Sequence, residues 1–274
     1  MARDNDRGFL SNPAIRDYDG SEGVITSDRT FSVQGAAIKT LVLLAILACT
    51  FAYTWNLTTQ GFAEAYAPVQ QADGVVRPPD AIDIPGNVIG LALLGCFGGF
   101  AVALVVIFVQ RTAPFLAPVY AALEGLALGA ISAGFEAKYP GIALQAIGST
   151  LGVTFGMLVL YGTGILRPTA GFVAGLLAAM FGIILLYTID IIMQCFGTYV
   201  PIVHDNSWWG IGLQFVIVGV AALNLIVDFG LIADAAENKA PAWYEWYAGF
   251  SLLVTLVWLY LEILKLLAKF KSKD

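Results

Sequence analysis

The chain has 274 residues, of which 58% are hydrophobic and 12% charged, and its formal net charge is −6. Soluble globular domains are roughly 45–50% apolar and about 25% charged. The composition, with a mean hydropathy of +0.78, therefore excludes an ordinary soluble protein and predicts an integral membrane protein.

Seven apolar stretches are long enough to cross a bilayer. A hydrocarbon core of about 30 Å needs roughly 20 helical residues at a rise of about 1.5 Å each. In chain order, the stretches cover residues 37–56, 87–109, 114–135, 142–161, 170–195, 209–233 and 246–268. Their Gly-rich runs, such as "GLALLGCFGGF" and "GLALGAISAGF", are typical of helices that pack closely in lipid. The sequence predicts an all-α polytopic membrane protein, a seven-transmembrane-helix bundle.

Polar segments flank and interrupt these spans. Residues 1–35 are polar, mixed in charge and without an apolar h-region, so we expect a disordered tail and no cleavable signal peptide. The acidic, Pro- and Gly-rich residues 56–86 predict a long loop. We expect residues 36–268 to form the transmembrane domain and residues 269–274 a basic tail.

The basic residues favour one orientation weakly. With the N-terminus in the cytoplasm, eight Lys and Arg residues fall inside and six outside, a small positive-inside bias. We therefore expect a cytoplasmic N-terminus. Because the number of spans is odd, the basic C-terminus is then expected on the other side of the membrane.

The thiols and the imidazole give no metal-site signal. Cys49, Cys96 and Cys195 fall in apolar spans without Cys/His metal spacing, so we expect buried small hydrophobes and no cofactor. His204 lies in the loop "VPIVHDNSWW", where we expect it to be solvated. Its neighbour Asp205 leaves open a role in tuning a pH response.

Carboxylates inside the spans are the strongest functional signal. They are Glu124, Asp190, Asp228 and Glu262, while Glu245 marks the start of the last span. A mid-bilayer charge costs at least about 2.5–3.5 kcal/mol on insertion scales, so such residues face the bundle interior or a water-filled path. No Lys or Arg lies mid-span, which favours carboxylates that share a proton or hold a cation over isolated neutral carboxyls.

Asp190 has two interpretations. In "LLYTIDIIMQCFG" it lies near the outer end of a span, where a solvated helix-end acid is the simplest expectation. A cation site at the outer mouth is the alternative.

Three segments, in this order, resemble the Bax inhibitor-1 family, also called the transmembrane Bax-inhibitor-motif family. They are "PVYAALEGLALGAIS" (118–132), "NLIVDFGLI" (224–232) and "LYLEILKLL" (259–267). They are similar to segments of the third, sixth and last helices, although most relatives have Asp where this chain has Glu262. "SNPAI", "EWY" and the long first loop resemble a bacterial branch, which implies the bacterial plasma membrane.

The resemblance, which covers roughly residues 35–268, implies a central last helix surrounded by the other six. It also implies a Ca²⁺ leak whose pH sensor is a pair of carboxylates on the sixth and seventh helices. Carried over, these are Asp228 and Glu262. Arg111, between the second and third spans, matches the position of an arginine latch, although an ordinary positive-inside anchor explains it as well.

Helix geometry leaves the partner of Asp228 open. With the sixth and seventh helices antiparallel, Asp228 lies about 7–8 Å from its helix end and Glu262 roughly 25 Å from the same side. A level partner falls near Ser251, and Glu245 is closer in height than Glu262.

Two further residues join the predicted pathway. Glu124 is expected at a depth between Asp228 and Glu262, and these three carboxylates predict a ladder of oxygen ligands for transient Ca²⁺. Asn224, one turn from Asp228, can cap whichever carboxylate is charged.

We therefore expect a pH-sensitive Ca²⁺ leak that is gated by intramembrane carboxylates, with the bilayer, Ca²⁺ and protons as partners and no nucleic acid. The alternative is a regulator that binds another membrane protein, such as a membrane protease or a stress or cell-death factor. A proton-coupled transporter fits less well, because no inverted repeat is visible. An enzyme is not expected, because Asp190 and Asp228 differ in depth and no serine or zinc motif is present.

Overall fold

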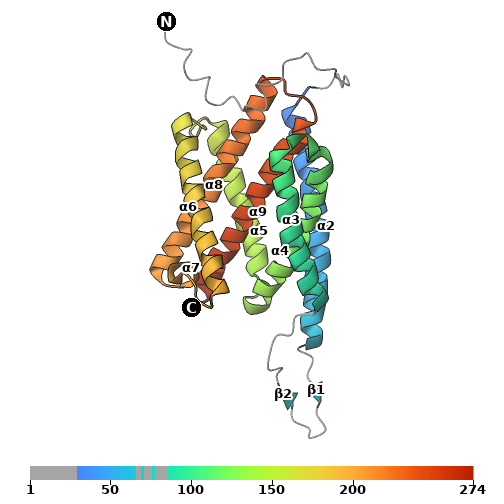
Figure 1. The fold of residues 1–274 in the computed structure, drawn as a ribbon, viewed down its shortest axis with the longest axis vertical. Helices are drawn as coiled ribbons and strands as arrows, with labels where there is room; N and C mark the ends of the chain where they lie inside the picture. Colours follow the sequence, from blue (N-terminus) through green and yellow to red (C-terminus); the bar gives the residue numbers. More distant parts are fainter. Residues whose placement is uncertain (1–29, 66–68, 71–75, 78–85, 274) are drawn as a thin grey trace.

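A computed structural model of the chain describes residues 30–65, 69–70, 76–77 and 86–273 (Figure 1). The predicted disordered tail, except for its last residues, lies outside the described residues, as does much of the predicted first loop.

The described elements are mostly long helices. In chain order they are α2 (Val33–Ala65), β1 (Val69–Gln70), β2 (Val76–Arg77), α3 (Gly86–Phe108), the 3₁₀ turn η1 (Gln110–Thr112), α4 (Ala113–Lys138), α5 (Ile142–Gly162), α6 (Ala170–Cys195), α7 (Pro201–His204), α8 (Trp208–Glu237) and α9 (Tyr244–Lys271). The two strands pair antiparallel, with Val69 opposite Arg77. Seven of the described helices are long and apolar enough to cross a membrane, which confirms the predicted all-α seven-span bundle.

Several helices are longer than their apolar windows. α2 continues beyond the predicted 37–56, and there the buried Thr58 hydroxyl donates to the carbonyl of Thr54 at 2.7 Å. α8 and α9 likewise pass residues 233 and 268, so the first residues of the predicted basic tail belong to α9. Hydropathy locates a span, but the hydrogen-bonded helix does not end where the apolar run ends.

Local signals explain several helix starts. Thr169 caps α6 by accepting a hydrogen bond from Phe172 N, and Ser207 caps α8 by accepting one from Gly210 N. α5 follows Gly141, whose φ of 82° is a conformation that glycine adopts without a steric penalty.

The helices run up and down, so that α2 begins and α9 ends at opposite ends of the bundle (Figure 1). We call these the N-terminal and C-terminal ends of the bundle. The η1 turn and the α8–α9 connection lie at the N-terminal end, whereas α7 lies at the C-terminal end.

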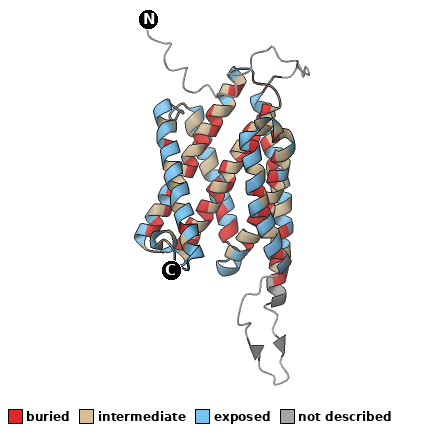
Figure 2. Cartoon of the chain, viewed as in Figure 1, coloured by how far each residue is buried: buried red, intermediate tan, exposed pale blue. Residues whose placement is uncertain are grey.

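α9 is the central helix. It packs against α2, α4, α5 and α8, and 56% of its apolar window is buried, against 6% for α6. Figure 2 shows this contrast, with α6 largely exposed. Of the two remaining helices, α3 packs mainly on α4 and α6 mainly on α8, so both occupy outer positions.

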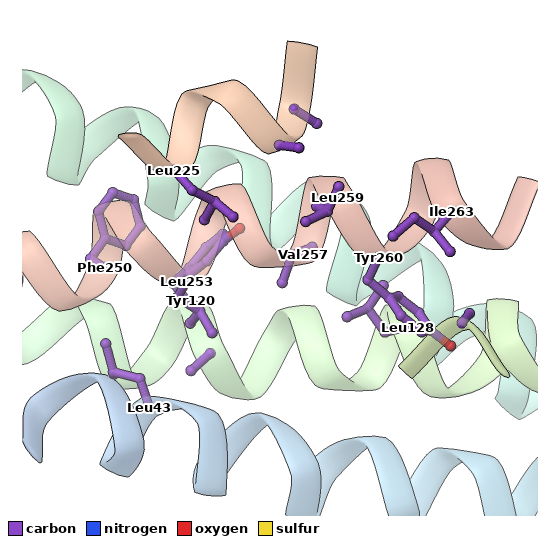
Figure 3. Close-up of a cluster of buried hydrophobic side chains, with 14 of the residues drawn as sticks. Leu43, Tyr120, Leu128, Leu225, Phe250, Leu253, Val257, Leu259, Tyr260 and Ile263 are labelled. Carbon is purple, nitrogen blue, oxygen red and sulfur yellow. The ribbon is translucent and has the colours of Figure 1, made fainter. Parts of the chain in front are cut away.

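The core surrounds α9, whose buried side chains lie on more than one face of the helix. Figure 3 shows its side chains packed with those of α2, α4 and α8 in one cluster; the labelled members include Leu43, Tyr120, Leu128, Leu225, Phe250, Leu253, Val257 and Tyr260. Tyr120 meets the ring of Phe250 edge-on, with centroids 5.0 Å apart, an arrangement that aromatic pairs prefer.

Glycines let α4 approach α2. A Cβ added to Gly125 would overlap Thr50 Oγ1 and the carbonyl oxygen of Leu47, and one added to Gly129 would press on α2 backbone at Phe51. The spacing Gly-x-x-x-Gly places both glycines on one helix face, as in closely packed membrane helices. The position of α4, and of Glu124 on it, depends on this contact.

Candidate functional site

Asp228 is the buried acid at the α8–α9 contact. Its side chain accepts a hydrogen bond from Ser251 Oγ to Oδ1 at 2.6 Å, and the residue is 4% exposed. Oδ2 is buried and has no hydrogen-bond partner among the described residues. One turn earlier on α8 and one turn later on α9, Asn224 Nδ2 donates to Thr255 Oγ1 at 3.0 Å. These four residues form two polar rungs between antiparallel helices.

The rungs settle which residue is level with Asp228. The prediction that a level partner falls near residue 251 is confirmed by the Ser251 bond. Asp228 itself lies deeper than predicted, about 14 Å from the end of α8 at Glu237, because the helix is longer than its apolar window. The predicted role of Asn224 as a cap on a carboxylate is not what the hydrogen bonds show, since its amide binds Thr255.

Glu262 is not paired with Asp228. It lies 11 residues beyond Ser251 on α9, about 16 Å along the axis, and its carboxylate has three other donors. Tyr187 Oη and Gln214 Nε2 donate to Oε2 at 2.9 and 2.6 Å, and Lys265 Nζ pairs with Oε1 at 3.0 Å.

The expectation that no base neutralises a mid-span acid is therefore wrong for Glu262. Lys265 lies three residues further along α9, within the predicted last span 246–268. The helix continues past it to Lys271, which puts the ammonium on the same helix surface as the carboxylate. Through these contacts, Glu262 of α9 is bonded to α6 and α8 in the C-terminal half of the bundle.

Asp190 is an anchor and not a solvated acid. It is 4% exposed and accepts hydrogen bonds from Val200 N at 2.9 Å and Gln194 Nε2 at 2.7 Å. The ring of His204 lies 2.8 Å from its Oδ2. His204 is exposed, as predicted, and its ring also contacts Asp190, because α7 folds the connection back over the end of α6.

Glu124 faces a different neighbour from the other acids. Its Oε1 accepts a hydrogen bond from Tyr120 at 3.3 Å. Its Oε2 points toward Gly99 of α3, where an added Cβ would lie 3.1 Å away. The carboxylate therefore lies at the α3–α4 contact.

Glu245 holds the start of α2. Its Oε1 accepts hydrogen bonds from both the backbone N and the hydroxyl of Ser32, each at 3.0 Å. A negative charge next to the first turn of a helix is favoured by the helix dipole. Ser32 also caps Gly35 N at 2.9 Å, so Glu245 serves as a structural tie between α9 and α2.

Arg111 lies in η1 with an exposed side chain. No ion pair joins it to Asp228 in the part of the chain that the structure describes. The latch contact that the resemblance implies is thus not formed in this structure.

The predicted three-carboxylate ladder is not assembled. Asp228, Glu124 and Glu262 each bind different partners on different helices, and the described residues contain no group of three or more His, Cys, Asp or Glu side chains that could hold a metal ion. The three cysteines are exposed on the surfaces of their helices, contrary to the expectation that they are buried.

Several contributors were missed by sequence reasoning. Tyr187 and Gln214 lie inside predicted apolar spans, where their polar groups were the available signal, and Lys269 lies in the predicted basic tail. Lys269, 8% exposed, donates to the carbonyl oxygens of Val203 and Gly210 at 2.8 and 3.2 Å, so it ties the end of α9 to α7 and to the start of α8.

Asp205, in the loop before α8, is stabilised in its charged form. The hydroxyl and the backbone N–H of Ser207 lower the pKa of Asp205 below its ordinary value, because hydrogen bonds to a carboxylate favour its charged form. The N–H contact to Oδ1 is 3.0 Å long.

Comparison with curated proteins and with solved structures gave no match. A family model described as "Bax inhibitor 1 like" matches residues 11–272, which include every described helix and all of the carboxylates above. The seven-span bundle with its central last helix is therefore that of a membrane protein, and the chain belongs to the Bax inhibitor 1 like family.

Proposed function

We propose that this protein is a pH-sensitive Ca²⁺ leak pathway in which Asp228 is the titrating group. The observation that carries the proposal is the state of that carboxyl: it is buried between α8 and α9 and has one hydroxyl partner. Its second oxygen has no hydrogen-bond partner among the described residues. Buried carboxyls without a cationic partner are typical of functional sites in membranes.

The chemistry follows from the two protonation states. A neutral carboxyl is compatible with the closely packed α8–α9 contact. An ionised one needs water, further donors or a cation, because burying an unpaired charge is costly. Ionisation of Asp228 therefore favours a wetter arrangement of the two helices, in which the carboxylate also attracts a hard cation that prefers oxygen ligands.

The polar rungs give such a cation more than one contact. Ser251, Thr255 and Asn224 supply hydroxyl and amide oxygens one helical turn apart. Weak neutral ligands beside a single carboxylate suit conduction, which requires sites that release the ion.

This proposal differs from the two-acid sensor that the resemblance implies. Glu262 already has a cationic partner in Lys265 and two further donors, so its charge is compensated in place. We assign the pH response to Asp228 alone, with Ser251 as its partner.

The test is Ca²⁺ entry into sealed liposomes that contain the purified full chain, stepped from about pH 5 to about pH 8, where buried carboxyls can titrate. We expect the wild-type leak to increase as the pH is raised. Asp228→Asn should leave a low leak that does not respond to pH, because the amide cannot ionise.

Asp234→Asn is the matched control, since Asp234 lies on the same helix but nearer its end and is only partly buried. An unchanged pH response in Asp228→Asn would contradict the proposed sensor. Absence of flux in both wild type and variants, at equal protein density, would contradict the leak itself and would favour the regulator that binds another membrane protein. A cytoplasmic N-terminus in a bacterial plasma membrane is the setting that we propose for this activity.

A further inference from the structure

An open groove lies between α2, α3 and α4, away from the buried carboxylates. Its volume is about 460 Å³, within the range of roughly 300–1,000 Å³ that small-molecule sites occupy. The lining residues used below are Ala92 and Leu93 of α3 and Ala130, Gly134, Phe135 and Lys138 of α4.

The groove exists because small residues fall on facing helix surfaces. On α4, the lining positions 130, 131, 134, 135 and 138 repeat at helical spacing, so they share one face. A Cβ added to Gly134 would meet no atom within 4 Å. The hollow is therefore open space that a larger side chain could fill without a clash.

One cation, Lys138, is among the described residues that line this apolar groove. Lys138 is exposed in the last turn of α4, with its ammonium 5.4 Å from the ring centroid of Tyr139. Among the described residues, no acid lines the groove. Glu136, the nearest acid along the helix, accepts hydrogen bonds from Gly141 N and Ala143 N at the start of α5, so its carboxylate faces another element.

The position of the groove and of Lys138 along the membrane-spanning helix fits a bound lipid. Lys138 is the last residue of α4, and Ala130 lies eight residues earlier, about 12 Å deeper along the axis. The cation is thus at headgroup level while the groove runs into the hydrocarbon. An amphiphile with a phosphate and an alkyl chain matches both parts.

We propose that this groove binds one anionic glycerophospholipid, with an acyl chain along Ala92, Ala130 and Gly134 and its phosphate beside Lys138. A net negative headgroup is favoured over a zwitterionic one, because the described lining residues include one positive charge and no acid to receive an ammonium group. The proposal is independent of the Ca²⁺ leak and of Asp228.

The experiment is native mass spectrometry of the purified full chain with phosphatidylglycerol or phosphatidylcholine of identical acyl chains. Wild type should retain phosphatidylglycerol at lower lipid concentration than phosphatidylcholine. Gly134→Leu should weaken binding of both lipids at least about tenfold, because the filled groove no longer buries an acyl chain. Lys138→Gln should weaken the binding of phosphatidylglycerol, but not of phosphatidylcholine, by about fivefold. This is the contribution of one lysine to binding at an anionic lipid surface.

Two matched variants test the location. Gly152→Leu adds the same bulk on the exposed face of α5, where an added Cβ also meets nothing, and Lys273→Gln removes a charge from the same end of the bundle. Both should bind phosphatidylglycerol as wild type does. Wild-type binding by Gly134→Leu, or an equal loss in Lys138→Gln and Lys273→Gln, would overturn the proposed site. Because Lys138→Gln leaves the packing untouched, it decides the matter even if Gly134→Leu folds poorly.

Discussion

Asp228 on α8 accepts a hydrogen bond of 2.6 Å from Ser251 on α9, and this bond joins the two helices at the level of the buried acid. The serine hydroxyl can donate to the charged carboxylate, and it can also accept from the neutral acid. One protonation event at Asp228 therefore changes the contact between the central helix and its neighbour.

Removal of the Ser251 hydroxyl should move the pH response of the leak. In Ser251→Ala, the midpoint of the pH-dependent Ca²⁺ flux is expected to shift upward by roughly one pH unit, because the charged carboxylate loses a donor. A hydrogen bond to a charged group contributes about 1.5–3 kcal/mol, and about 1.4 kcal/mol corresponds to one unit. Liposome flux measured against pH gives the midpoint.

Ser132→Ala is the control for this shift. It removes a buried hydroxyl that lies 2.6 Å from Tyr260 Oη, at a different contact of α9. A similar shift in both variants would mean that loss of packing, and not the bond to Asp228, sets the midpoint.

Glu262 should contribute to stability and not to pH sensing. Glu262→Ala removes the acceptor of Tyr187, Gln214 and Lys265, and breaking a buried ion pair costs about 3–5 kcal/mol. We expect the low end, about 3 kcal/mol, because the Lys265 side chain is 40% exposed. Thermal unfolding in detergent, followed by tryptophan fluorescence, should show a clearly lower midpoint.

The Glu262→Ala protein should keep a pH-dependent leak when it is assayed below its unfolding temperature. Glu237→Ala, which removes an exposed acid at the end of α8, is the stability control. A flat pH profile in Glu262→Ala would show that Glu262 takes part in sensing after all.

The α2–α4 contact should tolerate no methyl group at Gly125. In Gly125→Ala, the new Cβ overlaps Thr50 and the Leu47 carbonyl, and overpacking typically costs about 1–3 kcal/mol. Gly148→Ala on α5, where an added Cβ meets nothing within 4 Å, should leave stability unchanged or slightly higher. Equal melting temperatures for the two variants would contradict the close packing of α4 on α2.

The start of α8 should loosen in acid. The pKa of Asp205 is lowered by its hydrogen bonds from Ser207, so its contribution is present above the ordinary aspartate pKa of about 3.9 and is lost as the pH falls through the lowered value. The protection of the first turn of α8, measured as its hydrogen-exchange rate relative to the intrinsic rate at each pH, should decrease in strong acid.

Asp205→Asn should show this lower protection already near neutral pH, because the amide is a weaker acceptor than the carboxylate. Asp234→Asn, near the opposite end of the same helix, should not change exchange at the α8 start. Protection that does not change in acid in the wild type would mean that the Ser207 contact does not hold this turn.

The sequence by itself determined the class of the protein, its seven spans and the helices on which the acids lie. Hydrophobic stretches near 20 residues are sufficient for this, because in lipid every backbone polar group must be satisfied within a helix. Antiparallel helix geometry also placed Ser251 level with Asp228, since both positions follow from the rise per residue and the position of one turn.

Only the tertiary structure decided the partners of the other acids. Glu262 accepts hydrogen bonds from Tyr187 and Gln214 because α6 and α8 bring these side chains to α9. Asp190 binds His204 because α7 folds back across the end of α6. Glu124 faces α3 because glycines fix how closely α4 approaches its neighbours. Hydropathy has no information on helix ends, rotation or approach, which side-chain packing and hydrogen bonds determine.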